Sequence, residues 1–238
     1  MQYILFFGVI FVGYLLGSIP NGLWIVKVVT GKDVRLIESG RTGGTNVLRA
    51  AGFIPGLLTA LLDILKGASA VWVAKAAFPE EVYPGVYWVY VLAATAAILG
   101  HNYSIFMPEF DEQKKFRRFR GGAGGAPALG GAIGLWSPIA LIILPLGVIV
   151  YFTIGYASVT TLSVAFFAMV VFGIKYLLDP TSSDNPLPYV LYGLFAIILL
   201  AWALKPNITK LIAGNERVIN ISLHGWLKKK KENKTQED

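Results

Sequence analysis

The stretch GGAGGAPALGGAIG, residues 121–134, decides how many times this chain can cross a membrane. It carries no charge and is rich in glycine, yet it is shorter than the roughly 20 residues that a helix needs to span the hydrocarbon. Short or irregular segments persist at membrane depth only where protein surrounds them or where they line a cavity. If the flanking chain lies in a membrane, this stretch therefore predicts a short helix packed inside protein.

The flanking chain has the composition of a multi-pass membrane protein. Of its 238 residues 55% are hydrophobic, and the mean hydropathy is +0.61, which a soluble domain of this size rarely shows. Six apolar blocks are evident, at about residues 2–29, 53–78, 82–107, 135–155, 158–178 and 186–205. Each approaches or exceeds the length of a span. No positive charge precedes the first block, so we expect a retained helix, interrupted near Pro20, rather than a cleaved leader.

Charge sorts the connecting segments into two groups. The basic group consists of residues 30–52, residues 108–121 and the tail after residue 205, which includes the run Lys228–Lys231. The acidic group consists of residues 77–85, charged only by Glu80 and Glu81, and residues 179–186, charged only by Asp179 and Asp184. Because short basic loops stay in the cytoplasm, we expect the first group inside the cell and the second outside.

The number of crossings follows from these two groups. Three apolar blocks lie between residues 108–121 and the basic tail, although an even number of crossings is required, and only residues 121–134 can supply the fourth. The sequence therefore predicts an all-α, multi-pass integral membrane protein with seven spans, one of them the short glycine-rich helix. We expect the protein in the cell (inner) membrane, with its N-terminus outside and its C-terminus in the cytoplasm. Residues 1–217 form the expected membrane-embedded domain, and residues 218–238 a basic cytoplasmic tail beside anionic lipid.

Four polar clusters on the expected inner side suit an anionic ligand. The loop Ser39–Arg49 combines two arginines and two threonines with glycines, which let backbone N–H groups approach an anion. Asp63 and Lys66 lie one turn apart within a span, where ionisable residues mark either a functional site or a self-neutralising structural pair. Residues 100–126 place a basic residue before glycine-rich backbone, and residues 205–217 form a basic collar beside the last span. Each of these two could be a site or a structural feature.

Several chemistries are excluded. The chain has no cysteine, which removes disulfides, thiolate catalysis and cysteine-ligated metals. Its two histidines, His101 and His224, lie far apart, so we expect no zinc or other metal, and no cofactor. A soluble-type acyltransferase box needs an aspartate five residues after a histidine, where this chain has Phe106 and Lys229. The repeated aspartate motif of the CDP-alcohol phosphotransferases is also absent.

In their order and spacing, the clusters resemble the bacterial acyl-phosphate:glycerol-3-phosphate acyltransferase family (PlsY). The matching residues, over roughly residues 10–217, are Gly17-Ser18-Ile19-Pro20, Asn21-Gly22, Ser39-Gly40, Gly43, Thr45-Asn46-Val47-Leu48-Arg49, Asp63, Lys66-Gly67, Gly100-His101, Phe119-Arg120-Gly121-Gly122, Gly124, Tyr156, Ser158, Asn207-Ile208, Lys210-Leu211, Gly214 and Glu216. Several separate motifs in one order argue against a chance match. The resemblance implies seven spans and an inner-face active site, which agrees with the counting of crossings above.

The resemblance also implies an enzyme of phospholipid biosynthesis. It would transfer a fatty acyl group from acyl phosphate to the 1-hydroxyl of glycerol 3-phosphate, giving 1-acyl-glycerol 3-phosphate and phosphate. Both substrates carry phosphate, so the site needs cations and backbone donors, and the lipid-like donor requires an opening towards the bilayer. Acyl phosphate has a good leaving group, so positioning and charge neutralisation could supply much of the catalysis. The expected partners are these two substrates and the lipid bilayer, and no nucleic acid.

The motif matches imply a role for each site residue. Glycerol 3-phosphate would be held by Arg49, Ser39 and Ser158. Acyl phosphate would be held by Arg120 and the backbone of Gly121, Gly122 and Gly124. Thr45 and Asn46 would shape the loop, and Asp63 and Lys66 would brace or charge the pocket. Asn207 and Lys210 would close the pocket, and Glu216 would lock an arginine or lysine in place. His101 is either a general base, a task that a substrate phosphate oxygen could also perform, or a residue that orients the following loop.

Three positions depart from the family pattern. Ala123 replaces the second lysine of Phe-Lys-Gly-Gly-Lys-Gly, Leu204 replaces a histidine three residues before the asparagine, and Arg41 stands where asparagine is common. Arg41, also expected to bind substrate, could supply the cation missing at Ala123. The two losses leave an alternative, a non-catalytic or transport protein for a phosphorylated lipid or solute on the same scaffold. The charged stretch 109–118 lengthens a loop at the active face and could act as a lid.

Overall fold

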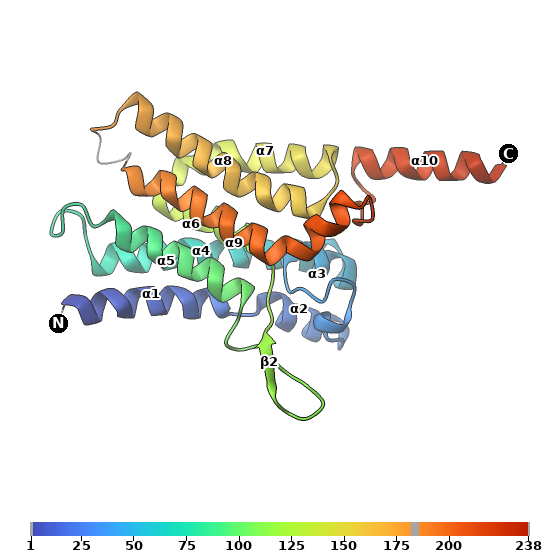
Figure 1. Ribbon diagram of the computed structural model, residues 1–238, viewed down its shortest axis with the longest axis horizontal. Helices are drawn as coiled ribbons and strands as arrows, with labels where there is room; N and C mark the ends of the chain where they lie inside the picture. The colour runs from blue at the N-terminus through green and yellow to red at the C-terminus, as the bar shows by residue number, and fades with distance from the viewer. Residues whose placement is uncertain (1, 182–185, 238) are drawn as a thin grey trace.

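The computed structural model describes residues 2–181 and 186–237, so Asp184 lies outside the described residues. Within these described residues, four stretches are long and apolar enough to cross a membrane, namely the pair α1 (Gln2–Ser18) and α2 (Asn21–Thr30), α4 (Phe53–Ala77), α8 (Ala157–Leu178) and α9 (Leu187–Ile212). Shorter elements are η1 (Val34–Leu36), α3 (Gly44–Ala51), α5 (Tyr87–Asn102), α6 (Gly125–Leu135), η2 (Ser137–Ile139), α7 (Ala140–Thr153) and α10 (Leu223–Glu237). The apolar helices run side by side as a bundle (Figure 1).

The predicted short glycine-rich helix is present as α6. It has 11 residues, and at 1.5 Å per residue it is about 16 Å long, roughly half the depth of the hydrocarbon. Most of its residues are buried, because it packs against α4, α5, α8 and α9. Glycine permits this approach: a Cβ on Gly130 would stand 1.9 Å from the carbonyl oxygen of Ile64, and one on Gly131 would stand 2.2 Å from the hydroxyl of Tyr192.

The first apolar block is interrupted where the sequence predicts it. Pro20 has no N–H to continue the ladder of α1, and α2 begins anew at the following residue, Asn21. Two side chains of α4 fasten this break. Lys66 Nζ donates to the carbonyl oxygen of Ile19 at 2.8 Å, and Asp63 Oδ1 accepts from the Asn21 amide at 3.1 Å.

The two ends of the bundle differ in charge. In Figure 1 the N-terminus and the loop between α4 and α5, which holds Glu80 and Glu81, lie at the left end. The loop before α3, the helix α10 and the C-terminus lie at the right end, where the basic segments of the sequence gather. We call the latter the basic end of the bundle. The charge asymmetry in the sequence thus corresponds to a separation in space.

Residues 108–119 form a β-hairpin, which corrects the all-α prediction. β1 (Pro108–Phe110) pairs antiparallel with β2 (Phe116–Phe119). The strands are stabilised because Phe110 faces Phe116, with ring centroids 6.3 Å apart, and Arg118 Nε lies 2.5 Å from the carboxylate of Glu109. The hairpin points away from the bundle (Figure 1) and contributes no wall to the cavity described below. In this structure it does not cover the cavity as a lid would.

The tail begins as packed structure. The N–H of Ile219 donates to the carbonyl oxygen of Gly155 at 2.7 Å, and Val218 forms an isolated β-bridge with Tyr156 at the corner between α7 and α8. Ile219 is buried. This anchoring brings the nearby Ile221 into the wall of the cavity.

Candidate active site

A cavity of about 520 Å³ lies at the basic end of the bundle, between helices that are distant in sequence. Its walls come from the loop before α3, from α3, from parts of α4 and α9, from the last turn of α5 and from the near ends of α6, α7 and α8. The predicted site residues that line it are Ser39, Arg41, Thr45, Asn46, Arg49, Asp63, His101, Gly124, Ser158 and Asn207. Ala123 and Leu204, where the resemblance expects polar side chains, also line it.

Two arginines face this cavity in different states. Arg49 is exposed, and among the described residues it has no hydrogen-bond or ion-pair partner. Arg41 reaches across to α9, where its Nη2 donates to the carbonyl oxygen of Ala203 at 2.6 Å and to Asn207 Oδ1 at 3.1 Å. Its Nη1 is buried without a partner among the described residues. Burial lowers the pKa of Arg41 from its ordinary value, but a guanidinium remains charged at neutral pH.

Asn46 and Arg120 hold the loop that carries Arg41. The amide nitrogen of Asn46 donates to the carbonyl oxygens of Ile37 at 3.1 Å and of Arg41 at 2.8 Å. Arg120 Nη2 donates to the carbonyl oxygens of Arg35 at 3.1 Å and of Gly40 at 3.3 Å. Arg120 thus binds the back of the loop and does not line the cavity, although the sequence assigned it to the acyl phosphate. The reason is that the carbonyl oxygens of Arg35 and Gly40 lie within reach of this guanidinium, and backbone carbonyl groups take the donors that are nearest.

The glycines before α6 allow close packing against His101. The N–H of Gly122 donates to the carbonyl oxygen of His101 at 2.9 Å. A Cβ on Gly122 would lie 1.9 Å from His101 Nε2, and one on Gly121 would lie 2.1 Å from the His101 carbonyl oxygen. Gly121 and Gly122 therefore do not line the cavity, but they bring the following Gly124 and the start of α6 to it.

Besides α4, whose first residue Phe53 also lines the cavity, three helices of the described chain begin at it without a side-chain cap. The first turns of α3, α6 and α8 contribute lining residues, and their N-cap positions are Gly43, Gly124 and Tyr156, none of which caps the helix with a side-chain hydrogen bond. The first N–H groups of a helix have no partner within it, and they lie at the positive end of the helix dipole. Convergence of three such ends makes this cavity a strong candidate for binding anions.

The predicted pair on α4 forms and reaches His101. Lys66 Nζ lies 2.9 Å from Asp63 Oδ1, and His101 Nδ1 lies 3.8 Å from the same oxygen, which is too long for a direct hydrogen bond. Asp63 and His101 line the cavity, whereas Lys66 does not and instead binds the break between α1 and α2. Asp63 Oδ2 is buried without a partner among the described residues. Lys66 therefore braces the site from behind, and Asp63 faces it.

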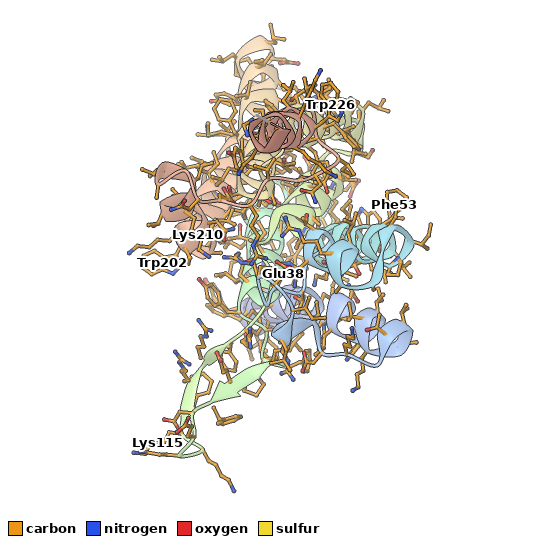
Figure 2. The ribbon with its side chains drawn as sticks, turned by 90° about the vertical axis from the view of Figure 1, so that its right-hand side faces the viewer. Glu38, Phe53, Lys115, Trp202, Lys210 and Trp226 are labelled. Atoms are coloured by element: carbon orange, nitrogen blue, oxygen red, sulfur yellow. The ribbon has the colours of Figure 1, made fainter. Side chains whose placement is uncertain are left out.

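A chain of hydrogen bonds joins α8, the tail and α9. Ser158 Oγ donates to Glu216 Oε2 at 2.5 Å, and the Asn207 amide donates to Glu216 Oε1 at 3.1 Å. Asn207 in turn accepts from Arg41. The sequence predicted that Glu216 would lock an arginine or lysine. It hydrogen-bonds a hydroxyl and an amide instead, and it acts on Arg41 through Asn207 and through its own nearby charge. Lys210, expected to close the pocket, is exposed and lies outside the lining, at the outer surface in Figure 2.

One side of the cavity is apolar and faces outward. It is lined by Phe53 and Leu57 of α4 and by Val148 and Phe152 of α7, all of which are exposed on the bundle surface. Figure 2 shows Phe53 at the outer edge of the molecule. Sequence reasoning did not single out these residues, because an apolar side chain within a span gives no sign of whether it faces lipid or a cavity. Thr161 was also missed, although its position one turn after Ser158 on α8 is a usable signal.

The arrangement can bind two phosphate-bearing molecules and one apolar chain. Arg41, Arg49 and the three helix ends provide positive charge, and the apolar side provides a surface for hydrocarbon. Within residues 2–181 and 186–237, no three His, Asp or Glu side chains gather closely enough to hold a metal ion.

Comparison with known proteins yields sequence matches over most of the chain. The profile of the family "Glycerol-3-phosphate acyltransferase" matches residues 7–214. The glycerol-3-phosphate acyltransferase of Rubrobacter xylanophilus is 36% identical over 208 residues, which cover 87% of this chain and 92% of the relative. A Synechococcus glycerol-3-phosphate acyltransferase is 36% identical over 204 residues, which cover 86% and 90% of the two chains.

Two crystal structures match the fold. Both are of PlsY (YgiH), an integral membrane glycerol 3-phosphate acyltransferase. The glycerol 3-phosphate form is 28% identical and superimposes with a TM-score of 0.72 over 90% of this chain and 95% of that chain. The lysophosphatidic acid form is 27% identical and gives a TM-score of 0.68 over 91% and 96%.

Proposed function

The chain belongs to the glycerol-3-phosphate acyltransferase family, and from that membership we propose how its cavity joins a fatty acyl group, delivered as acyl phosphate, to the 1-hydroxyl of glycerol 3-phosphate. The protein is a glycerol-3-phosphate acyltransferase of lipid biosynthesis, an integral membrane enzyme whose product is lysophosphatidic acid. The other product of the proposed reaction is inorganic phosphate.

The observation that carries the proposal is the meeting of positive charge and an apolar opening in one cavity. Three uncapped helix ends and two arginines face the interior, while Phe53, Leu57, Val148 and Phe152 lead outward between α4 and α7. A fatty acyl phosphate has a matching construction, with a hydrocarbon chain and a charged head. The donor enters sideways from the bilayer, and its phosphate reaches the helix ends.

The two phosphate groups bind in different parts of the cavity. Arg49, the arginine without a partner among the described residues, holds glycerol 3-phosphate together with Ser39 and Ser158. The first turn of α6, from Gly124 onward, holds the acyl phosphate. Arg41 stands over the cavity that Ala123 also lines, and it supplies a cation there in place of the missing lysine.

Positioning accounts for the chemistry. The 1-hydroxyl oxygen attacks the acyl carbonyl carbon, the bond from that carbon to the phosphate oxygen breaks, and phosphate leaves with the electron pair. The hydroxyl proton passes to a phosphate oxygen. Because the phosphate is a good leaving group, alignment of the two substrates and neutralisation of their charges supply most of the rate. His101 contributes by holding the glycine loop through its carbonyl oxygen and by packing near Asp63.

We propose that this site lies at the inner face of the membrane. We propose seven spans, formed by α1 with α2, α4, α5, the short α6, α7, α8 and α9, with the N-terminus outside and the C-terminus in the cytoplasm. The basic end of the bundle, which contains the cavity, then meets the cytoplasm, from which glycerol 3-phosphate arrives. Residues 218–238 form the basic cytoplasmic tail.

The test is acyl transfer by the purified chain in detergent micelles. We expect release of inorganic phosphate from acyl phosphate that depends on added glycerol 3-phosphate, together with formation of lysophosphatidic acid. Acyl-CoA should not replace acyl phosphate. Phosphate release that is indifferent to glycerol 3-phosphate, or binding of both substrates without product, would instead favour the non-catalytic or transport protein on the same scaffold.

A further inference from the structure

The hairpin β1–β2 has no part in the cavity, yet it is a defined structure with a direction. In Figure 1 it extends downward from the horizontal helices, and in Figure 2, viewed along the bundle axis, it runs to the lower left and ends at a tip near Lys115. The two views agree that the hairpin runs roughly perpendicular to the helices. In a membrane-spanning bundle, that direction lies parallel to the bilayer surface.

The base of the hairpin fixes its depth. Arg120 N donates to the carbonyl oxygen of Met107 at 2.9 Å, and Ser104 N donates to the carbonyl oxygen of Arg120 at 2.9 Å. These bonds close the hairpin directly after α5, which ends at Asn102, and beside the loop that Arg120 holds at Gly40. The hairpin therefore leaves the bundle where α5, one of the proposed spans, ends. It is level with the break between α1 and α2, since Ser104 Oγ donates to the carbonyl oxygen of Ser18 at 2.5 Å.

The surface of the hairpin combines aromatic rings with cations. Phe110 and Phe116 are 56% and 55% exposed, and they contact each other at 6.3 Å between centroids. Phe106, at the base, is 55% exposed. Phe side chains on an amphipathic surface element bury at the boundary between headgroups and acyl chains, and long basic side chains beside them reach the phosphates.

The charges of the hairpin leave a basic excess. Its cations are Lys114, Lys115, Arg117 and Arg118, and its carboxylates are Glu109, Asp111 and Glu112. Arg118 pairs with Glu109, and Asp111 accepts the backbone N–H groups of Gln113 and Lys115 as part of the turn. Lys114, Lys115 and Arg117 remain exposed, and so do Asp111 and Glu112. The four cations and three carboxylates leave an excess of one positive charge.

We propose that this hairpin lies on the bilayer surface beside the bundle and binds anionic phospholipid headgroups through Lys114, Lys115 and Arg117, with Phe106, Phe110 and Phe116 seated among them. The bilayer is the surface that a structure of this depth and direction meets first. Each cation near an anionic membrane surface contributes about a fivefold preference for it. The hairpin thus gives the protein an attachment to charged lipid that is separate from its spans.

The absence of native cysteine allows a direct test. Gln113→Cys places a single thiol at the exposed tip for an environment-sensitive fluorophore, and the protein is reconstituted in nanodiscs of phosphatidylcholine with or without phosphatidylglycerol. We expect brighter, blue-shifted emission and quenching by headgroup-level nitroxide lipid in the anionic discs. Salt at about 1 M, where the screening length falls to about 3 Å, should reverse the part of this fluorescence change that comes from electrostatic attraction.

Two charge variants distinguish lipid binding by the hairpin from general attraction of a basic protein to an anionic membrane. Lys114→Gln with Lys115→Gln and Arg117→Gln should reduce the response to phosphatidylglycerol by roughly fivefold or more. The matched control, Lys228→Gln with Lys229→Gln and Lys230→Gln, removes the same charge from α10 and should leave the response intact. Turnover in detergent should be unchanged in both, which reports that each variant is folded.

The proposal is overturned by three results. One is an equal signal in neutral and anionic discs; another is equal loss in the hairpin and α10 variants. The third is a fluorescence change that requires an added soluble protein, which would make the hairpin a protein-docking element. The baseline signal comes from a label at Val82→Cys, an exposed position in the loop between α4 and α5.

Discussion

Arg41 and Arg49 both bring a positive charge to one cavity, but only the guanidinium of Arg41 is fixed by hydrogen bonds within the described part of the chain. Arg41 is committed to α9 through the carbonyl oxygen of Ala203 and through Asn207, so it acts as a fixed part of the wall. Arg49 is exposed, and no hydrogen bond or ion pair binds it within the described part of the chain. The arginine without a partner is the better candidate for the group that a substrate phosphate engages on arrival.

Replacing Arg49 with alanine should nearly abolish acyl transfer while leaving the fold intact. Loss of charge-assisted hydrogen bonds to phosphate predicts a fall in kcat/KM of about 100-fold or more, and the missing side chain leaves no described contact broken. Phosphate release that depends on glycerol 3-phosphate is the measurement, with Arg117→Ala, an exposed arginine outside the cavity, as the control. Near-normal turnover by a folded Arg49→Ala protein would refute the assignment.

Lys66 offers a test of structural bracing. Lys66→Met removes the cation from the buried carboxylate of Asp63 and the donor from the Ile19 carbonyl oxygen, so we expect the free energy of unfolding to fall by about 3–5 kcal/mol. Adding Asp63→Leu should restore part of this loss, because no charge is then left buried alone. Unfolding in detergent for the single and double variants gives the coupling. Strictly additive losses would show that the pair does not act as a unit.

The sequence identified residues near the cavity more readily than the direction each side chain takes. Arg120 was expected to bind acyl phosphate, but it binds two backbone carbonyls and lies 3.9 Å from the carboxylate of Glu109. Glu216 was expected to lock an arginine or lysine, but it hydrogen-bonds a hydroxyl and an amide. Motif spacing brings residues together; which atom a side chain reaches depends on turns that only the folded backbone defines. Tyr151, which also lines the cavity, lay within an apolar block that gave no signal.

At the scale of elements, α6 shows how close approach of backbones builds the site. The glycines of α6 let the backbone of α4 come into direct contact with it. This packing directs the uncapped first turn of α6 into the cavity. The short helix could be predicted because a bilayer tolerates so few alternatives for a short apolar segment. The hairpin could not be predicted in the same way, since its short strands are rich in charge and read as an exposed loop.

Alanine at two glycines should separate packing from helix propensity. Gly130→Ala directs a Cβ to 1.9 Å from the Ile64 carbonyl oxygen and should cost about 1–3 kcal/mol or more of stability, with loss of turnover as α6 shifts. Gly147→Ala on α7 meets only a methyl group of Val164 at 3.6 Å. It should be neutral or stabilising by up to about 1 kcal/mol.

Thermal unfolding and turnover of both glycine variants provide the measurement. Equal behaviour of Gly130→Ala and Gly147→Ala would mean that α4 and α6 can separate without harm, contrary to the packing described here.

For the whole molecule, the separation of charge between the two ends sets the orientation. A reporter fused after the C-terminus should read as cytoplasmic, whereas one inserted beside Gly85, in the loop between α4 and α5, should read as extracytoplasmic. Single cysteines at Val82 and Gln113 allow the same test by membrane-impermeant labelling of intact cells. A C-terminal reporter that reads as extracytoplasmic would remove both the seven-span topology and the inner-face site.

The overall architecture was more accessible from the sequence than the details of the site. Block lengths and loop charges predicted the bundle because the bilayer imposes helix length and charge placement directly. The packed start of the tail was not foreseen, since Val218 and Ile219 are anchored by single backbone contacts to the corner at Gly155 and Tyr156.

The outward apolar side of the cavity, between α4 and α7, has a kinetic consequence. A donor that enters through it is drawn from a two-dimensional solution, the leaflet, whereas glycerol 3-phosphate is drawn from a three-dimensional one. Diluting the leaflet with inert lipid, at constant total donor, should therefore slow the reaction as though donor had been withdrawn, and enlarging the aqueous volume should not. The enzyme then responds to the composition of its membrane per unit area, so growth of the bilayer by its own downstream products would itself slow further synthesis unless new acyl phosphate kept pace.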